Sequence, residues 1–173
     1  MRRRASILVA IALMLAPASA RAEISDTAVK AAFIPKFARY VTWPPSAPAR
    51  TNAQILLCII GDDPFGGMLV QSASGQEVDG RPFAVRHLSS AAGASDCAIA
   101  FVDGANSGQT LAALGRQPVL TVTDSRSSTQ HGIIHFAIVD GRVRFYIDNA
   151  QALARGLTIS SRLLALAIGV NQK

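Results

Sequence analysis

The feature that most constrains the fold is a set of short, unbroken apolar runs, each closed by turn residues. The runs are QILLCIIG (54–61), DCAIAFVD (96–103) and PVLTVTDS (118–125), and RPFAVRHL (81–88) is a further strand-like segment. A strand that is apolar at every position needs cover on both faces, as in parallel sheets. Helix-like segments at 62–73 and 107–117 separate the runs. This alternation predicts a parallel α/β sheet with right-handed crossovers.

The segment before the first run has helical spacing. Apolar residues recur at three- and four-residue steps over 26–41, which predicts an amphipathic helix capped by Ser25 or Asp26. Pro35 lies inside it and should kink or break it. The following Trp43 precedes a proline, which favours an extended conformation there.

The C-terminal third has a different pattern. Two β-rich arms over 132–148 flank Asp140-Gly141, a strong hairpin signal. The second arm alternates apolar and polar residues, so we expect one buried and one exposed face. A helical turn over 149–156 and a final helix over 159–170, capped by Ser160 or Ser161, complete the prediction. The segment DDPFGGMLVQSA (62–73) is expected to form a helix capped by Asp62 or Asp63.

The N-terminus reads as a secretory signal peptide. Arginines at positions 2 to 4 precede an apolar run over 7–16, and small residues offer cleavage after Ala20 or Ala22. The run is too short to span a bilayer, which takes roughly 20 residues. We therefore predict a signal peptide over 1–22 and one exported domain over 23–173. The alternative is an uncleaved N-terminal anchor.

The charge balance argues against nucleic acid as a partner. The chain has 17 Lys and Arg against 11 Asp and Glu. Cleavage after Ala22 removes four of the arginines, which leaves 13 against 11 and a net charge of about +2. The remaining arginines are scattered and form no basic stripe, so a nucleic-acid interface is not expected.

Cys58 and Cys97 are the only cysteines, and both lie in predicted core strands. Export would place them in an oxidising compartment, which favours a disulfide over two buried free thiols. A bridge of this span would stabilise the fold by up to roughly 4 kcal/mol. Because neither cysteine belongs to a C-x-x-C motif, a catalytic redox role is not expected.

No segment presents a recognisable catalytic or metal site. His131 and His135 would lie about 13 Å apart on a strand, too far for one zinc ion, so we expect them and His87 to be ordinary surface or hairpin residues. GDDPFGG (61–67) lacks the glycine spacing and the lysine of phosphate-binding loops. The sequence therefore predicts no enzyme, no cofactor and no metal, and a hydrolase using Ser160 or Ser161 is a minor alternative.

Several segments, in order, carry the pattern of a known family. They are VKAAFIPKFARYVTWPP, ILLCIIGDDPFG, GRPFAVRHL, CAIAFV, PVLTVTD and the closing GIIHFAIVDGRVRFYIDNAQALARGLTISSRLLALA. With these segments, the chain resembles the YfiR/HmsC-like periplasmic repressor family over nearly all of its mature length. The opening helix into Trp-Pro and the closing segment are the most specific parts.

The resemblance implies a Rossmann-like, mostly parallel sheet flanked by helices, with a C-terminal antiparallel hairpin and final helix. It also implies a periplasmic protein that binds the periplasmic sensor domain of a membrane diguanylate cyclase and represses it, which lowers cyclic di-GMP and biofilm formation. An outer-membrane lipoprotein or altered redox conditions would release the repression. Family members carry a disulfide matching Cys58–Cys97, and here a single bridge fits a structural staple better than a redox sensor.

The candidate partner surface combines the first and last predicted helices with Trp43, which either fills the core or forms a rim for the partner. Its candidate residues are Lys36, Arg39, Trp43, Arg155 and Arg162, and Lys30 is expected on the same outward, basic helix face. So apolar a chain also permits a homodimer. The alternative function is a periplasmic small-ligand-binding protein, with its pocket at the strand ends near 61–67 and 123–125.

Overall fold

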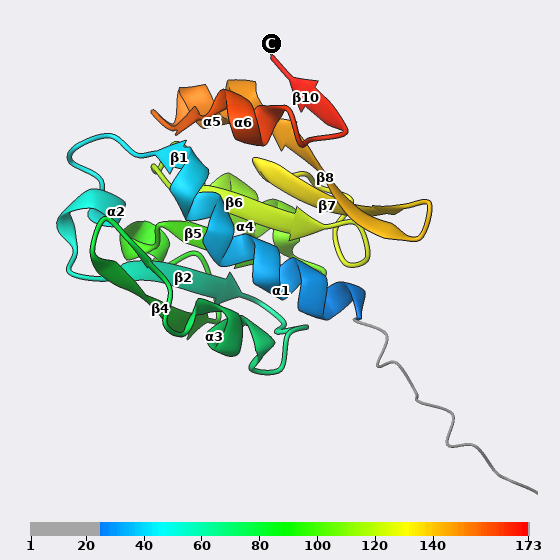
Figure 1. The fold of residues 1–173 in the computed structure, drawn as a ribbon, viewed down its shortest axis with the longest axis horizontal. Helices are drawn as coiled ribbons and strands as arrows, with labels where there is room; N and C mark the ends of the chain where they lie inside the picture. Colours follow the sequence, from blue (N-terminus) through cyan, green and yellow to red (C-terminus); the bar gives the residue numbers. More distant parts are fainter. Residues whose placement is uncertain (1–24, 173) are drawn as a thin grey trace, which may run out of the picture.

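The computed structural model describes residues 25–172, so the predicted signal peptide lies outside the described residues. Its centre is an eight-stranded sheet in the order β10-β8-β7-β6-β5-β2-β4-β3 (Figure 1). The strands are β2 (Ile55–Ile60), β3 (Glu77–Val78), β4 (Arg81–Leu88), β5 (Ile99–Val102), β6 (Leu120–Asp124), β7 (Ile134–Val139), β8 (Arg142–Asp148) and β10 (Gly169–Asn171). Strands β4, β2, β5, β6 and β7 are parallel, whereas β8 pairs antiparallel with β7. The predicted mostly parallel α/β sheet is confirmed.

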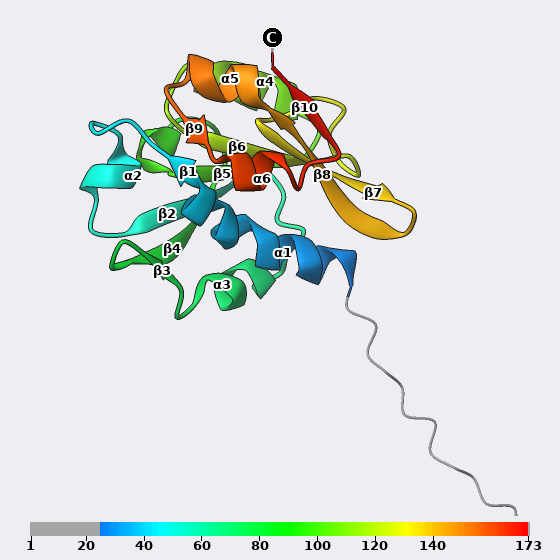
Figure 2. The same cartoon turned by 45° about the horizontal axis from the view of Figure 1, so that its top comes forward.

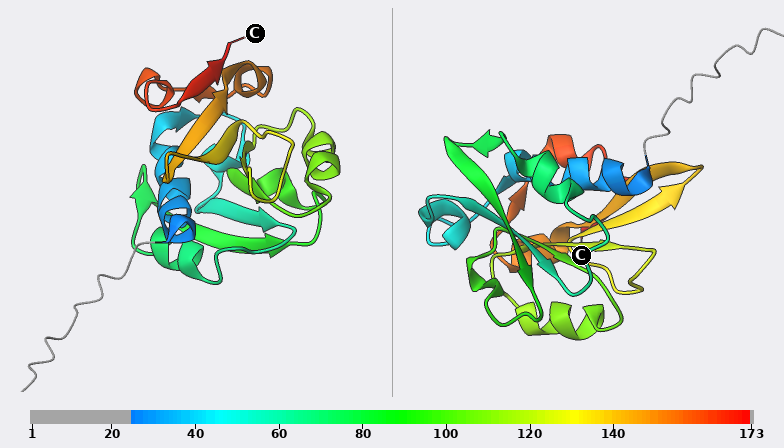
Figure 3. Two further views of the ribbon diagram at one scale, coloured as in Figure 1. Left: turned by 90° about the vertical axis from the view of Figure 1, so that its right-hand side faces the viewer. Right: turned by 90° about the horizontal axis from the view of Figure 1, so that it is seen from below.

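Helices cover both faces of this sheet. They are α1 (Asp26–Phe37), α2 (Pro48–Thr51), α3 (Met68–Ala73), α4 (Ser107–Leu114), α5 (Asn149–Ala154) and α6 (Ser161–Leu164), with 3-10 turns η1 (Ala38–Tyr40) and η2 (Ala94–Asp96). Helices α1, α3 and α6 lie on one side, and α4 and α5 lie on the other (Figures 2 and 3). Within residues 25–172, no helix is long and apolar enough to span a bilayer.

Strand β2 shows why its sequence is apolar throughout. Leu57 and Ile59 face the larger core beneath α1 and α3. Cys58 and Ile60 face a smaller core that includes Leu114 of α4. Alternate side chains therefore enter opposite cores, so every position of the strand must be apolar.

Helix α1 begins and packs as its sequence suggests. The Ser25 hydroxyl caps it by accepting a hydrogen bond from the Ala28 N–H at 3.2 Å. The helix continues through Pro35 to Phe37 before it tightens into η1, so the alternative of a break at Pro35 is wrong. The Phe37 ring lies 5.5 Å from that of Phe145 on β8, which ties the helix to the C-terminal hairpin.

The predicted hairpin is present, and its turn lies at the predicted Asp140-Gly141. Asp140 and Gly141 both have positive φ, at 51° and 69°, as the favoured two-residue hairpin turns require. Val139 pairs directly with Arg142, and on β8 Phe145 is buried while Tyr146 is exposed.

Two short strands that the sequence analysis did not predict join the segment after α1 to the segment before α6. Strand β1 (Val41–Thr42) pairs antiparallel with β9 (Thr158–Ile159). The Ser160 N–H also donates to the Tyr40 carbonyl at 2.8 Å. The end of α1 is thus fixed to the start of α6.

Two predicted helices are shorter than expected. The segment over 62–73 becomes helical only at Met68, because two glycines with positive φ precede it. The Asp63 carboxylate accepts from the Phe65 N–H at 2.8 Å and so closes the loop before the helix. The final helix over 159–170 is limited to α6, which Ser160 caps, and the chain then extends into β10 beside β8. Backbone pairing with the sheet edge outweighs the local helical pattern there.

Candidate functional site

Cys58 and Cys97 form a disulfide. Cys58 lies in β2, and Cys97 lies two residues before the start of β5, so the bridge joins these neighbouring strands. The Cα atoms of the two cysteines lie 5.9 Å apart, and each cysteine is 1% exposed. A reductant has no direct access to sulfur atoms buried this deeply. This geometry suits a staple between adjacent strands.

Two of the predicted partner-binding residues lie in the interior, which corrects that assignment. Trp43 is 6% exposed, and its indole N–H donates to the Ala98 carbonyl at 3.2 Å, so it fills the core. Arg155 is 7% exposed and donates to the Val119 carbonyl and the Gln151 side chain. Burial lowers the pKa of the Arg155 guanidinium. Neither side chain is available to a partner on the surface.

Lys30 also differs from the sequence expectation, because it points into the protein. Its side chain is 2% exposed, and its Nζ lies 2.5 Å from Oδ2 of Asp124 at the end of β6. This ion pair ties the middle of α1 to the carboxyl edge of the sheet. The outward charge of α1 after its first turn is therefore limited to Lys36, and Arg39 follows in η1.

The remaining predicted residues, Lys36, Arg39 and Arg162, are exposed. Because β1 pairs with β9, the segments that carry them lie next to each other, and Figure 2 shows α6 beside the end of α1. Within the described part of the chain, none of the three takes part in an ion pair. Leu166, in the turn that follows α6, is 62% exposed. These four residues define the α1/α6 face.

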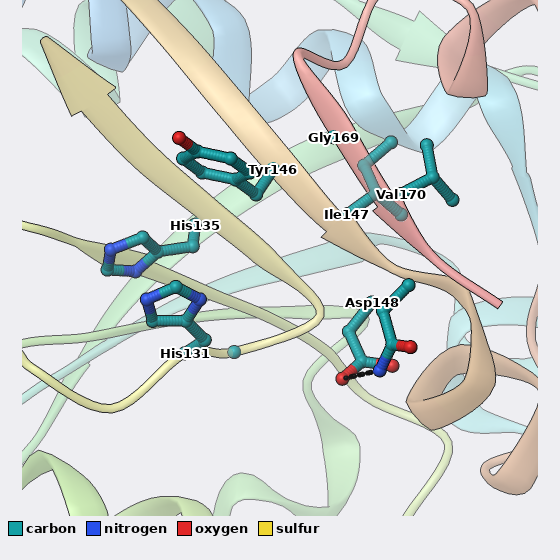
Figure 4. Close-up of a pocket in the computed structure, with 9 residues that line it drawn as sticks. His131, His135, Tyr146, Ile147, Asp148, Gly169 and Val170 are labelled. Atoms are coloured by element: carbon teal, nitrogen blue, oxygen red, sulfur yellow. Dashed lines mark hydrogen bonds between the residues drawn. The ribbon is translucent and has the colours of Figure 1, made fainter. Parts of the chain in front are cut away.

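A pocket of about 350 Å³ lies between the hairpin and β10 (Figure 4). The rings of His131 and His135 stack at its wall with centroids 3.7 Å apart, and Tyr146 lies across from them. The predicted separation of about 13 Å is wrong, because residues 131–133 precede β7 and are not extended strand. On the pocket floor, the Asn171 amide donates to the Asp148 carboxylate at 3.2 Å.

His135 is held neutral in this wall. It is 4% exposed, and its Nδ1 lies 2.8 Å from the Thr123 hydroxyl. Burial, with a smaller contribution from the charge of His131, lowers the pKa of His135 to about 4. The described residues contain no group of three or more His, Cys, Asp or Glu arranged to hold a metal ion. The pocket instead offers flat ring faces and hydrogen-bonding groups.

A second, more polar pocket of about 260 Å³ lies at the carboxyl ends of β2 and β5. Gly61, Asp62, Asp103 and Asn106 are among its lining residues. The sequence placed a ligand pocket near 61–67 and 123–125, and the structure brings only the start of the first segment to this hollow. Asp103 was missed, although its position directly after a buried strand was a usable signal.

Comparison with known proteins places the chain among related sequences. The sequence model of the YfiR/HmsC-like family matches residues 27–168, which cover nearly all of the described fold. The match includes both cysteines, the α1/α6 face and the polar pocket, but it stops before the β10 residues 169–171 that help to line the histidine pocket. A comparison with curated proteins gave no significant match.

Proposed function

The chain belongs to the YfiR/HmsC-like family, and on this premise we propose that it is a periplasmic regulator of diguanylate cyclase signalling. In this proposal it binds the periplasmic sensor domain of a membrane diguanylate cyclase and holds that enzyme inactive. The family match over residues 27–168 is the observation that carries the proposal. A buried disulfide and an N-terminal segment with the pattern of a signal peptide support the periplasmic location.

Repression by binding requires a difference in affinity between two states of the target. A regulator that binds the active and inactive sensor equally well shifts nothing. Moving a sensor from almost fully active to almost fully inactive takes a preference of about 10⁴-fold, or roughly 5.5 kcal/mol. An interface that rearranges with the sensor is therefore needed, and a small rigid contact is not enough.

The α1/α6 face is the surface we propose for this contact. It joins an exposed apolar side chain, Leu166, to three basic residues without partners in ion pairs of the described chain. Apolar anchors inside a charged rim are typical of protein interfaces. Its basic character suits an acidic patch on the sensor domain.

The test is co-purification of the cyclase with tagged protein from detergent-solubilised membranes, together with cellular cyclic di-GMP levels. The double variant Arg39→Glu/Arg162→Glu is expected to weaken capture about tenfold or more and to raise cyclic di-GMP, because like charges across an interface cost several kcal/mol. Arg142→Glu, on the exposed face of β8, is the matched control and should behave as wild type. Unchanged cyclic di-GMP after deletion of the gene would contradict the proposal.

A second candidate function is the binding of a small planar molecule, favoured by the pocket of Figure 4. Its His131 and Tyr146 rings offer stacking surfaces. Native mass spectrometry of protein purified from the periplasm would detect a bound small molecule. His131→Ala should abolish that binding, and its retention in the variant would exclude this pocket.

A further inference from the structure

The polar pocket at β2 and β5 lies at the topological switch point of the sheet. The chain leaves β2 through α3 toward β4 on one side, and it leaves β5 through α4 toward β6 on the other. The parallel strands follow the order β4-β2-β5-β6-β7, which is the flavodoxin-like order 2-1-3-4-5. Open α/β sheets bind ligands in the crevice outside the strand ends at this point.

Close approach of two loops forms the pocket. Gly61 has φ of 95°, and a Cβ there would lie 2.3 Å from the Asp103 carbonyl oxygen, so only glycine fits. A Cβ on Gly104 would lie 3.1 Å from Oδ2 of Asp62. The Asp62 carboxylate therefore sits against the loop that carries Asp103, and both residues line the hollow.

Asp103 is the pocket residue whose side chain indicates a bound ligand. It is 8% exposed, and its Oδ1 is buried without a hydrogen-bond partner in the described chain. Burial raises the pKa of the Asp103 carboxyl, the bond from the Gly104 N–H opposes this rise, and the charges of Asp124 and Asp62 add to it. An unsatisfied buried acceptor costs about 1–3 kcal/mol, more when it is charged. Such an atom in a native protein needs a proton, a water or an ion.

The local charge balance favours a cation. Lys30 lowers the pKa of Asp103, but its ammonium group is already paired with Asp124 at 2.5 Å. Asp62 and Asp103 therefore remain as two carboxylates that form no ion pair within residues 25–172. Asp63, the next residue, is turned away, since its carboxylate contacts the Phe65 N–H and the His87 ring.

We propose that this pocket binds a hydrated divalent cation, Mg²⁺ or Ca²⁺, through the carboxylates of Asp103 and Asp62. Mg²⁺ typically uses one or two carboxylates and keeps several waters. Two carboxylates in a hollow of about 260 Å³ leave room for that hydration shell. This site differs from the α1/α6 face, so its occupancy and the binding of a protein partner are tested separately.

The experiment titrates the folded protein with Mn²⁺ as a probe and follows the loss of the free-ion signal by electron paramagnetic resonance. Wild type should bind one ion with Kd of about 10⁻⁴–10⁻³ M, and Mg²⁺ or Ca²⁺ should displace it. Asp103→Asn should weaken binding about tenfold or more, because it removes a charge and keeps the shape. Asp62→Asn, an exposed position where folding is not at risk, should give the same result.

Asp63→Asn is the matched control, because it removes the neighbouring charge outside the pocket. Its affinity should stay within about twofold of wild type. No signal loss up to about 10 mM Mn²⁺, far above the expected Kd, would overturn the proposal. Equal weakening by Asp63→Asn and Asp103→Asn, or wild-type binding by Asp103→Asn, would overturn it as well.

Discussion

Replacing Lys30 with Met should destabilise the protein strongly, although the sequence presents Lys30 as an ordinary helix-surface residue. Its ammonium group lies 2.5 Å from the Asp124 carboxylate, and the two side chains are 2% and 10% exposed. In Lys30→Met, the one bond to the Asp124 carboxylate that remains among residues 25–172 is the 3.2 Å bond from the Arg126 N–H, and Asp124 stays buried beside Asp103. Removing one partner of a buried pair costs about 3–5 kcal/mol. This is a large part of the roughly 5–15 kcal/mol available to a typical domain.

The assay is urea unfolding followed by far-ultraviolet circular dichroism on a double-mutant cycle. Lys30→Met and Asp124→Leu should each lower the free energy of unfolding by about 3–5 kcal/mol. The double variant should lose much less than the sum, because it leaves no unpaired charge, with a coupling energy of at least about 2 kcal/mol. Lys36→Met, an exposed position on the same helix, is the control and should change stability by less than about 0.5 kcal/mol. Additive losses in the cycle would refute the reasoning.

Four further predictions concern the core and the buried His135. Cys58→Ala/Cys97→Ala opens a crosslink that spans 39 residues and should cost about 4 kcal/mol in urea unfolding, and a loss below about 1 kcal/mol would contradict the staple role. In intact protein, dithiothreitol should reduce this bridge only at the rate of unfolding, so rapid reduction in native buffer would show that it is accessible. The pKa of His135 is lowered to about 4, so its contribution to the free energy of unfolding should be complete above about pH 6.5 and should fall by about 3 kcal/mol as the pH drops to 4. His135→Gln should remove most of this dependence of stability on pH, and an unchanged dependence would contradict the assignment. Trp43→Phe deletes the bond to the Ala98 carbonyl and should cost about 1–3 kcal/mol in thermal unfolding, whereas no loss would place the indole outside the core.

The strands were the part of the fold that the sequence predicted well. Strand β4 occupies the predicted residues 81–88, and the Asp140-Gly141 turn fixes the hairpin register. These signals are local, because alternation and turn chemistry act between neighbours in the chain. The final helix over 159–170 failed for the opposite reason. Its last two residues pair with Tyr146 and Ile147, and helical spacing carries no information about that distant edge.

The candidate site was predicted less well, because its chemistry depends on which side chains point inward. Lys30 and Lys36 look equivalent in the sequence, yet one is buried in an ion pair and the other is exposed. The His131–His135 stack depends on a loop conformation that spacing alone does not give. The disulfide is the exception, since compartment and strand placement already favoured it.

Pairing of β1 with β9 has a consequence for how the polypeptide matures. Residues 41–42 find their strand partners only at 158–159, and α1 packs on the hairpin formed after residue 133. The β1–β9 pair and the contact of α1 with the hairpin can therefore form only when almost the entire polypeptide is available, and contacts this remote in sequence form slowly. The link that fixes the end of α1 to the start of α6 is therefore the last part of the fold to close, and it closes from opposite ends of the domain.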